Sequence, residues 1–236
     1  MISKAEEIQQ QLERLADPEK AEQLQRFFKT GPGEYAEADR FRGIRVPALR
    51  KLARQYEGID LADAAALLES GYHEDRLLAL LLLVRMAAIG DGDIRSRIYR
   101  LYLEKTAFIN NWDLVDTSAE HIVGAYLDGK SKRPLHRLAR SASLWERRMA
   151  IMATFYDIKR GRFAQTLQLA EMLLDDPHDL IHKAVGWMLR EIGKRDTEEE
   201  EDFLKQHYHT MPRTMLRYAI ERFPETKRKR YLRGEI

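Results

Sequence analysis

Apolar side chains recur every three to four residues along almost the whole chain, which is the spacing that places them on one face of an α-helix. No segment alternates apolar and polar residues in the manner of a half-buried strand. Several prolines fall at or just before an expected first helical turn, where the missing N–H is not needed. The pattern predicts helices over residues 3–15, 18–29, 46–56, 60–70, 73–89, 92–107, 110–128, 132–142, 144–158, 162–175, 178–194, 197–209, 212–222 and 224–233.

Short connections join the predicted helices, and pairs of them recur every roughly 35–45 residues. This organisation is typical of an all-α fold, an α-solenoid of HEAT-like or armadillo-like antiparallel helix pairs. We expect one domain over residues 1–236. The exception to helix is residues 30–43, whose three glycines and one proline predict a loop or a small hairpin.

Composition narrows the class of protein. The 236 residues are 44% hydrophobic and 33% charged, which excludes a disordered chain. The longest apolar run, residues 77–84, is much shorter than the roughly 20 residues that cross a bilayer. Residues 1–7 contain no hydrophobic signal segment, so we expect a cytoplasmic protein with no membrane contact. The absence of cysteine excludes disulfides, thiolate metal sites and cysteine nucleophiles.

Charge is unevenly distributed along a chain whose formal net charge is only +2. Residues 1–129 contain 17 Lys/Arg and 22 Asp/Glu, whereas residues 130–195 contain 14 and 7, and residues 196–236 contain 9 of each. The basic middle segment indicates a localised anionic partner. The simpler interpretation, solvated helix faces, stays open at this point.

Trp187 lies on the polar side of its predicted helix. At 100° per residue the apolar stripe of residues 178–194 comprises Ile181, Val185, Met188, Leu189 and Ile192. Trp187 projects from the opposite side, together with Lys183, Arg190 and Lys194. Aromatic rings stack on sugars and bases while cations contact phosphates, so this face suits nucleic acid. The alternative is that Trp187 packs against a neighbouring helix.

Two further side chains suggest chemistry. Trp112 and Asp116 are four residues apart and therefore share a helix face, where a carboxylate can stabilise positive charge or orient a water. A core tryptophan and a capping aspartate are the alternative. Arg148 falls in an apolar sector, so its guanidinium needs an acceptor, either a buried acid such as Asp116 or a phosphate.

The remaining patterns are weaker. His178 and His182 lack the intervening glutamate of a zinc protease helix, and no phosphate-binding glycine loop or serine elbow is present. We therefore expect no metal and no cofactor. Arginines near the N-terminal third add to the expected basic surface, namely Arg42, Arg45, Arg50 and Arg54.

Three motifs together resemble the AlkD-type DNA alkylation repair family, which is built of HEAT-like repeats. They are residues 111–116 (Asn-Trp-Asp-Leu-Val-Asp), 145–150 (Trp-Glu-Arg-Arg-Met-Ala) and 183–191 (Lys-Ala-Val-Gly-Trp-Met-Leu-Arg-Glu). The resemblance spans the chain and is sharpest over residues 107–195. It implies a monofunctional DNA glycosylase that releases cationic N3- or N7-alkylated purines from double-stranded DNA without flipping the base.

The resemblance also implies roles for individual residues. Trp112 and Trp187 match the aromatics that hold the lesion's deoxyribose, and Asp116 matches the carboxylate that stabilises the oxocarbenium-like sugar and positions water. Arg148 matches a residue that contacts the DNA backbone. A basic concave surface would bind phosphates through Lys183, Arg190, Lys194, Arg45 and Arg50. We expect a monomer that associates with the nucleoid when bound to DNA.

Two departures from the family pattern leave alternatives open. Phe27 stands where the family's glycosylases carry a tyrosine, and residues 30–43 form a longer loop than expected. Related HEAT-like proteins with these features are associated with branched-DNA binding and little base excision. There the loop would be a hairpin that enters a groove or junction, with Tyr35, Arg40 and Arg42 as contacts. Phe27 is itself expected among the DNA-binding residues. A HEAT-like protein-binding scaffold is a third hypothesis, and it predicts an exposed apolar groove and salt-insensitive binding.

Overall fold

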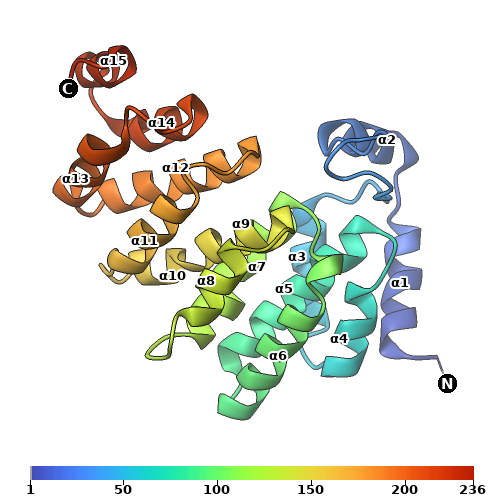
Figure 1. Ribbon diagram of the computed structural model, residues 1–236. Coiled ribbons are helices and arrows are strands. Elements are labelled where there is room, and N and C mark those ends of the chain that lie inside the picture. Colours follow the sequence, from blue (N-terminus) through green and yellow to red (C-terminus); the bar gives the residue numbers. More distant parts are fainter. Residues whose placement is uncertain (1) are drawn as a thin grey trace. The chain divides into compact units, whose positions relative to one another are not determined.

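The computed structural model describes residues 2–236, which form helices joined by short loops (Figure 1). The only β pairing among these residues is an isolated bridge between Arg40 and Tyr72. The all-α fold of successive packed helices is therefore confirmed, whereas the basic concave surface stays a prediction. None of the described helices is long and apolar enough to cross a membrane.

Backbone contacts divide the chain into two compact units, residues 1–122 and 123–236. The prediction of a single domain is not tested by this division. The first unit contains α1 (Lys4–Arg14), α2 (Pro18–Phe27), α3 (Val46–Gln55), α4 (Leu61–Leu68), α5 (His73–Ile89), α6 (Gly92–Glu104), the 3-10 turn η1 (Thr106–Phe108) and α7 (Trp112–Ala119). A π-helical turn, η2 (Glu120–Gly124), follows α7 directly.

The second unit contains α8 (Arg133–Ala139), α9 (Leu144–Ala153), α10 (Phe155–Ile158), α11 (Ala164–Met172), α12 (Asp179–Gly193), α13 (Thr197–His207), α14 (Arg213–Ala219), the 3-10 turn η3 (Ile220–Arg222) and α15 (Glu225–Arg233). Each predicted helix is present, with its ends shifted by a few residues or its last turn split off. Residues 110–128 are the exception, since α7 ends early and η2 replaces its continuation.

Side-chain caps explain where many helices begin. Ser3 accepts a hydrogen bond from the backbone of Glu6 while the Glu6 carboxylate accepts one from Ser3, a complete capping box at α1. Asp17 caps α2 ahead of Pro18, and Asp196 accepts from two backbone N–H groups of α13. These caps satisfy donors that have no partner within the helix, which fixes the helix starts.

A helix that is buried over most of its length, α5, organises the first unit. α5 packs against α3, α4, α6 and α7, and its residues 77–83 are all buried. The sequence pattern suggested an amphipathic helix here, but α5 is surrounded by other helices, so it is apolar on every side along this stretch.

α12 has the corresponding position in the second unit. It packs against α9, α10, α11, α13 and α14, and every residue of the predicted apolar stripe is buried. Gly186 allows α14 to approach closely, because a Cβ there would overlap the carbonyl oxygen of Met215 and the side chain of Tyr218. This close approach accounts for the glycine in the Val-Gly-Trp motif.

Residues 30–43 form an irregular loop, so the hairpin alternative is not realised. Gly33 and Gly43 have φ of 76° and 83°, values that favour glycine. A Cβ at Gly43 would also overlap the backbone of Asp17, which means that the loop returns tightly onto the start of α2.

Candidate functional site

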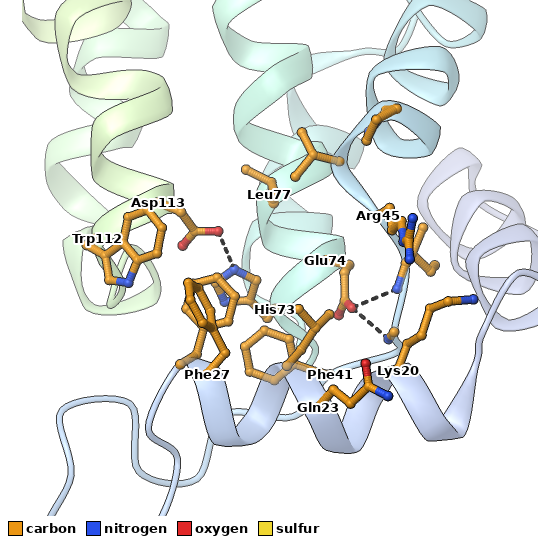
Figure 2. Close-up of a pocket in the computed structure, with 16 residues that line it drawn as sticks. Lys20, Gln23, Phe27, Phe41, Arg45, His73, Glu74, Leu77, Trp112 and Asp113 are labelled. Atoms are coloured by element: carbon orange, nitrogen blue, oxygen red, sulfur yellow. Dashed lines mark hydrogen bonds and ion pairs between the residues drawn. The ribbon is translucent and has the colours of Figure 1, made fainter.

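The first unit contains a cavity of about 570 Å³ between α2, the segment that follows the loop, and the first turns of α5 and α7. Its walls are mainly aromatic and aliphatic side chains. Figure 2 shows Trp112 and Asp113 at one side of this cavity and Lys20 and Arg45 at the other. The cavity therefore combines apolar walls with cations at one edge.

A stack of aromatic rings forms one wall. The Phe28 ring stacks on Trp112 with centroids 5.3 Å apart and on Phe41 with centroids 5.1 Å apart. Phe27 meets the rings of Phe28 and Trp112 edge-on, at 5.0 and 6.2 Å. Phe28 is buried, whereas Phe27 is 64% exposed. The buried Phe28 ring thus supports one face of Trp112, and the exposed Phe27 ring extends the aromatic wall into solvent.

His73 connects this stack to two carboxylates. Its Nε2 donates to Asp113 Oδ2 at 2.8 Å, and its Nδ1 faces Asp39 Oδ2 at 3.6 Å. Burial lowers the pKa of His73, but the hydrogen bond to Asp113 and the nearby Asp39 carboxylate outweigh it and raise the pKa to about 9. The ring lies 4.6 Å from Phe41 and 5.0 Å from Phe28. A buried imidazolium therefore supports the first turn of α7, on which Trp112 lies.

The residues that follow His73 in the first turn of α5 bind the loop formed by residues 30–43. Glu74 accepts hydrogen bonds from the backbone N–H groups of residues 42, 43 and 44. Asp75 binds the Arg42 guanidinium through two hydrogen bonds, at 2.7 and 3.1 Å, and Arg76 donates to Asp39. We call residues 73–76 the charged turn. All four side chains are buried, so the turn fixes the loop to α5.

Sequence reasoning missed the charged turn. The available signal was four consecutive ionisable residues directly before the longest apolar run of the chain. A helix that is buried from its first residue carries its first turn into the interior, where charges need partners. That inference requires knowing that α5 is central, which its sequence alone does not establish.

Comparison with known proteins decides the family. The family model described as DNA alkylation repair enzyme matches residues 8–223. The chain belongs to this family. The family confirms the resemblance drawn from the three motifs, and it supports a role in DNA alkylation repair.

Solved structures share the fold of this DNA alkylation repair family member. A predicted DNA alkylation repair enzyme from Enterococcus faecalis is 15% identical with a TM-score of 0.68, covering 89% of this chain and 97% of its own. AlkD2 from Streptococcus mutans is 16% identical with a TM-score of 0.56, covering 88% and 99%. The protein smu.31 from Streptococcus mutans UA159 is 18% identical with a TM-score of 0.54, covering 76% and 93%. No curated protein matches in sequence.

The cavity brings together some of the residues that the sequence predicted for the site. Trp112, Phe27 and Arg45 line it. Asp116 is half-buried and lies one helical turn after Trp112 on α7, but it is not among the lining residues. Arg50 is exposed on α3 outside the cavity lining.

The loop residues predicted as DNA contacts lie outside the cavity lining. Tyr35 is half-buried in the loop and does not line the cavity. Arg42 was predicted to add to a basic surface, and this prediction is wrong. Its guanidinium is buried and bound to Asp75 and Glu13, because it anchors the loop. Arg40 lies over the Tyr72 ring and donates to its hydroxyl at 2.6 Å.

Trp187 and Arg148 belong to the second unit. The Trp187 ring is half-buried, lies 6.2 Å from the Phe155 ring and donates from Nε1 to Glu191. Both parts of the sequence interpretation therefore apply, since the ring leaves the apolar stripe and also meets a neighbouring helix. Arg148 is buried and donates to the backbone carbonyl of Leu180 at 2.5 Å. This carbonyl is an acceptor that the sequence did not indicate.

The three cations that flank Trp187 all have acidic partners. Lys183 pairs with Asp179 at 2.8 Å, Lys194 pairs with Glu191 at 2.5 Å, and Arg190 pairs with Glu221. Although burial raises the pKa of Glu191, the hydrogen bonds from Lys194 and Arg195 hold it below its ordinary value. The predicted basic face of α12 is thus neutralised in large part by its own carboxylates.

Within residues 2–236, no group of three His, Cys, Asp or Glu side chains is placed to hold a metal ion.

Proposed function

We propose that this protein is a monofunctional DNA glycosylase that hydrolyses the N-glycosidic bond of cationic N3- or N7-alkylated purines in duplex DNA. The supporting observation is Trp112, half-buried at the first turn of α7 and stacked on Phe28, which in turn stacks on Phe41. A ring fixed in this way offers its remaining surface to a sugar at small entropic cost.

Asp116 supplies the charge that the reaction needs. It lies four residues after Trp112, which corresponds to a rise of about 6 Å along the same helix face. As the glycosidic bond breaks, its electron pair moves to the purine and cancels the positive charge there, while C1′ becomes oxocarbenium-like. The Asp116 carboxylate stabilises this cation electrostatically. Water then attacks C1′ and loses its proton to Asp116 or to solvent.

No general acid is required, because an alkylated purine with a positive charge is already a good leaving group. A pocket that recognises a flipped base is then unnecessary, and selectivity follows from the lability of the lesion itself. In this proposal Trp187 is the second aromatic ring on the deoxyribose.

The test is release of free base from a duplex that contains N7-methylguanine. We expect release by the wild type, no measurable release by Asp116→Asn, and duplex affinity within about twofold for both proteins. Asp93→Asn is a matched control, because Asp93 is exposed in the first turn of α6. Loss of duplex binding by Asp116→Asn would assign Asp116 a structural role instead.

Two observations favour other functions, and the same assay separates them. Phe27 has no hydroxyl to reach DNA, which favours a branched-DNA-binding protein with little excision; salt-sensitive binding without base release would establish it. The apolar walls of the cavity favour a protein-binding scaffold. That hypothesis requires partner binding that is insensitive to salt, and it fails if duplex affinity falls steeply between about 50 and 200 mM salt.

A further inference from the structure

The cations of residues 130–195 are not equally available to a partner. Seven of them form ion pairs with carboxylates: Lys132, Arg147, Arg162, Lys183, Arg190, Lys194 and Arg195. Arg148 is buried and bound to a backbone carbonyl. The excess positive charge of this segment therefore has to reside in a smaller set of side chains.

Three arginines belong to that set, two on α8 and one at the residue that directly follows it. Arg133, Arg137 and Arg140 are exposed, and within the described part of the chain none of their guanidinium groups makes a hydrogen bond or ion pair. Their spacing of four and three residues places them within about 60° of one another around the helix axis. We call these three residues the arginine row. It spans about 10 Å along the helix.

Mutual repulsion makes the row electrostatically unfavourable in the isolated protein, although Arg137 and Arg140 lie at the C-terminal end of α8, where the helix dipole favours cations. Like charges three and four residues apart on a helix repel each other. Arg133 is also the first residue of α8, where the backbone presents positive charge, and this first turn contains no acidic residue. By contrast, the first turns of α1, α5 and α13 each contain at least two acids. A surface of this kind is stabilised when anions bind to it.

The row lines a second cavity, of about 590 Å³, whose other lining residues are His136, Leu138, Ser141 and Glu146. The His136 ring is held in place by a 2.9 Å hydrogen bond between its Nε2 and Gln165 of α11. The cavity shares no lining residue with Trp187 or the cations around it. The surface is thus hollowed and polar, and Glu146 is the one residue of the family motifs that lines it.

We propose that the arginine row binds the sugar-phosphate backbone of DNA, at a contact additional to the residues of the lesion site. This inference rests on the proposed function, because it takes DNA as the partner. A row of guanidinium groups matches a ligand whose anions repeat along a line, and a strand of duplex DNA presents one phosphate per about 3.4 Å of axis. Successive phosphates of a strand lie farther apart than this rise, because the strand winds around the axis, so about two phosphates face the row. Each can be bound by an arginine through paired hydrogen bonds.

The experiment measures duplex affinity against salt concentration for the triple variant R133Q/R137Q/R140Q. The matched control, K4Q/K205Q/K229Q, removes the same charge at exposed lysines that are paired with acids. Loss of about two phosphate contacts lowers the slope of log affinity against log salt by about 2 and weakens binding about tenfold or more at low salt. The control retains the wild-type slope. Both variants retain the wild-type circular dichroism spectrum and, at saturating protein, the wild-type rate of base release.

The outcomes are distinguishable. A wild-type slope for R133Q/R137Q/R140Q, or an equal fall for both triple variants, overturns the assignment of the arginine row and leaves the glycosylase proposal intact. Wild-type protein that binds duplex DNA without salt dependence and releases no base overturns the proposed function, and with it this inference.

Discussion

At the scale of single residues, His73 shows how a buried ionisable group is made stable. Burial alone favours the neutral ring, yet Asp113 and Asp39 both face the imidazole and favour the cation. The faces of Phe28 and Phe41 lie against the same ring and add a favourable cation–π interaction. Removal of the imidazole leaves the buried Asp39 and the half-buried Asp113 carboxylates beside aromatic walls, which costs more than the loss of a single hydrogen bond.

This environment predicts a pH-dependent contribution to stability. The pKa of His73 is about 9 in the folded protein and 6.5 by reference, so its stabilisation is complete below about pH 6.5 and is lost as pH rises through 9. The corresponding free energy is on the order of 3 kcal/mol. We expect His73→Gln to lower the free energy of unfolding most at pH 6, with the difference from wild type shrinking by pH 9.5. Urea unfolding at both pH values measures it, and a difference that is constant with pH would contradict the cationic state.

Individual site residues were predictable where the signal is local. The position of Trp187 outside the apolar stripe follows from helical periodicity alone, and the structure agrees. The burial of Arg42 was not predictable, because its partners Asp75 and Glu13 lie far away in sequence. Arginines that anchor a loop and arginines that face solvent look the same in one sequence.

At the scale of helices, boundaries were largely predictable because caps and prolines act locally. Asp17, Asp60, Asp91 and Asp196 each cap the helix that begins after them. The π-helical turn after α7 was not predictable. It inserts a residue into the helical register without any glycine or proline at its start, so the sequence pattern continues as though the helix were regular.

The contact between α12 and α14 gives a test at this scale. Gly186→Ala places a methyl group against the backbone of Met215, and we expect it to lower the free energy of unfolding by about 1–3 kcal/mol. This loss occurs although alanine favours helix over glycine by about 1 kcal/mol. Gly92→Ala is the control, since Gly92 lies in the first turn of α6 with open space around it. Thermal unfolding that ranks Gly186→Ala at or above Gly92→Ala would show that α14 moves away without cost.

At the scale of the whole molecule, the two compact units raise the question of cooperativity. A single domain over residues 1–236 unfolds in one transition, and substitutions in either unit then lower the same midpoint. We expect His73→Gln in the first unit and Gly186→Ala in the second to shift one common calorimetric transition. Two transitions, each moved by one variant only, would divide the chain near residue 122.

The positive charge that the molecule offers to a partner depends on which cations are paired with carboxylates. Composition indicated a basic middle segment, and this is correct as a count of residues. Ion pairing decides which of those cations face a partner, and it depends on contacts between helices that a linear sequence does not specify. The arginine row was therefore hidden within a segment whose most conspicuous cations, around Trp187, are paired with acids.

The charged turn has a consequence for how this sequence can diverge. Replacing Asp75 alone leaves the Arg42 guanidinium without its two main hydrogen bonds, and replacing Arg42 alone leaves a buried carboxylate. Homologues that keep the fold must therefore substitute both residues together, or retain both. Pairwise covariation between positions 42 and 75, and between 39 and 76, should thus be detectable among homologues that keep this loop, even where the surrounding surface has diversified beyond recognition.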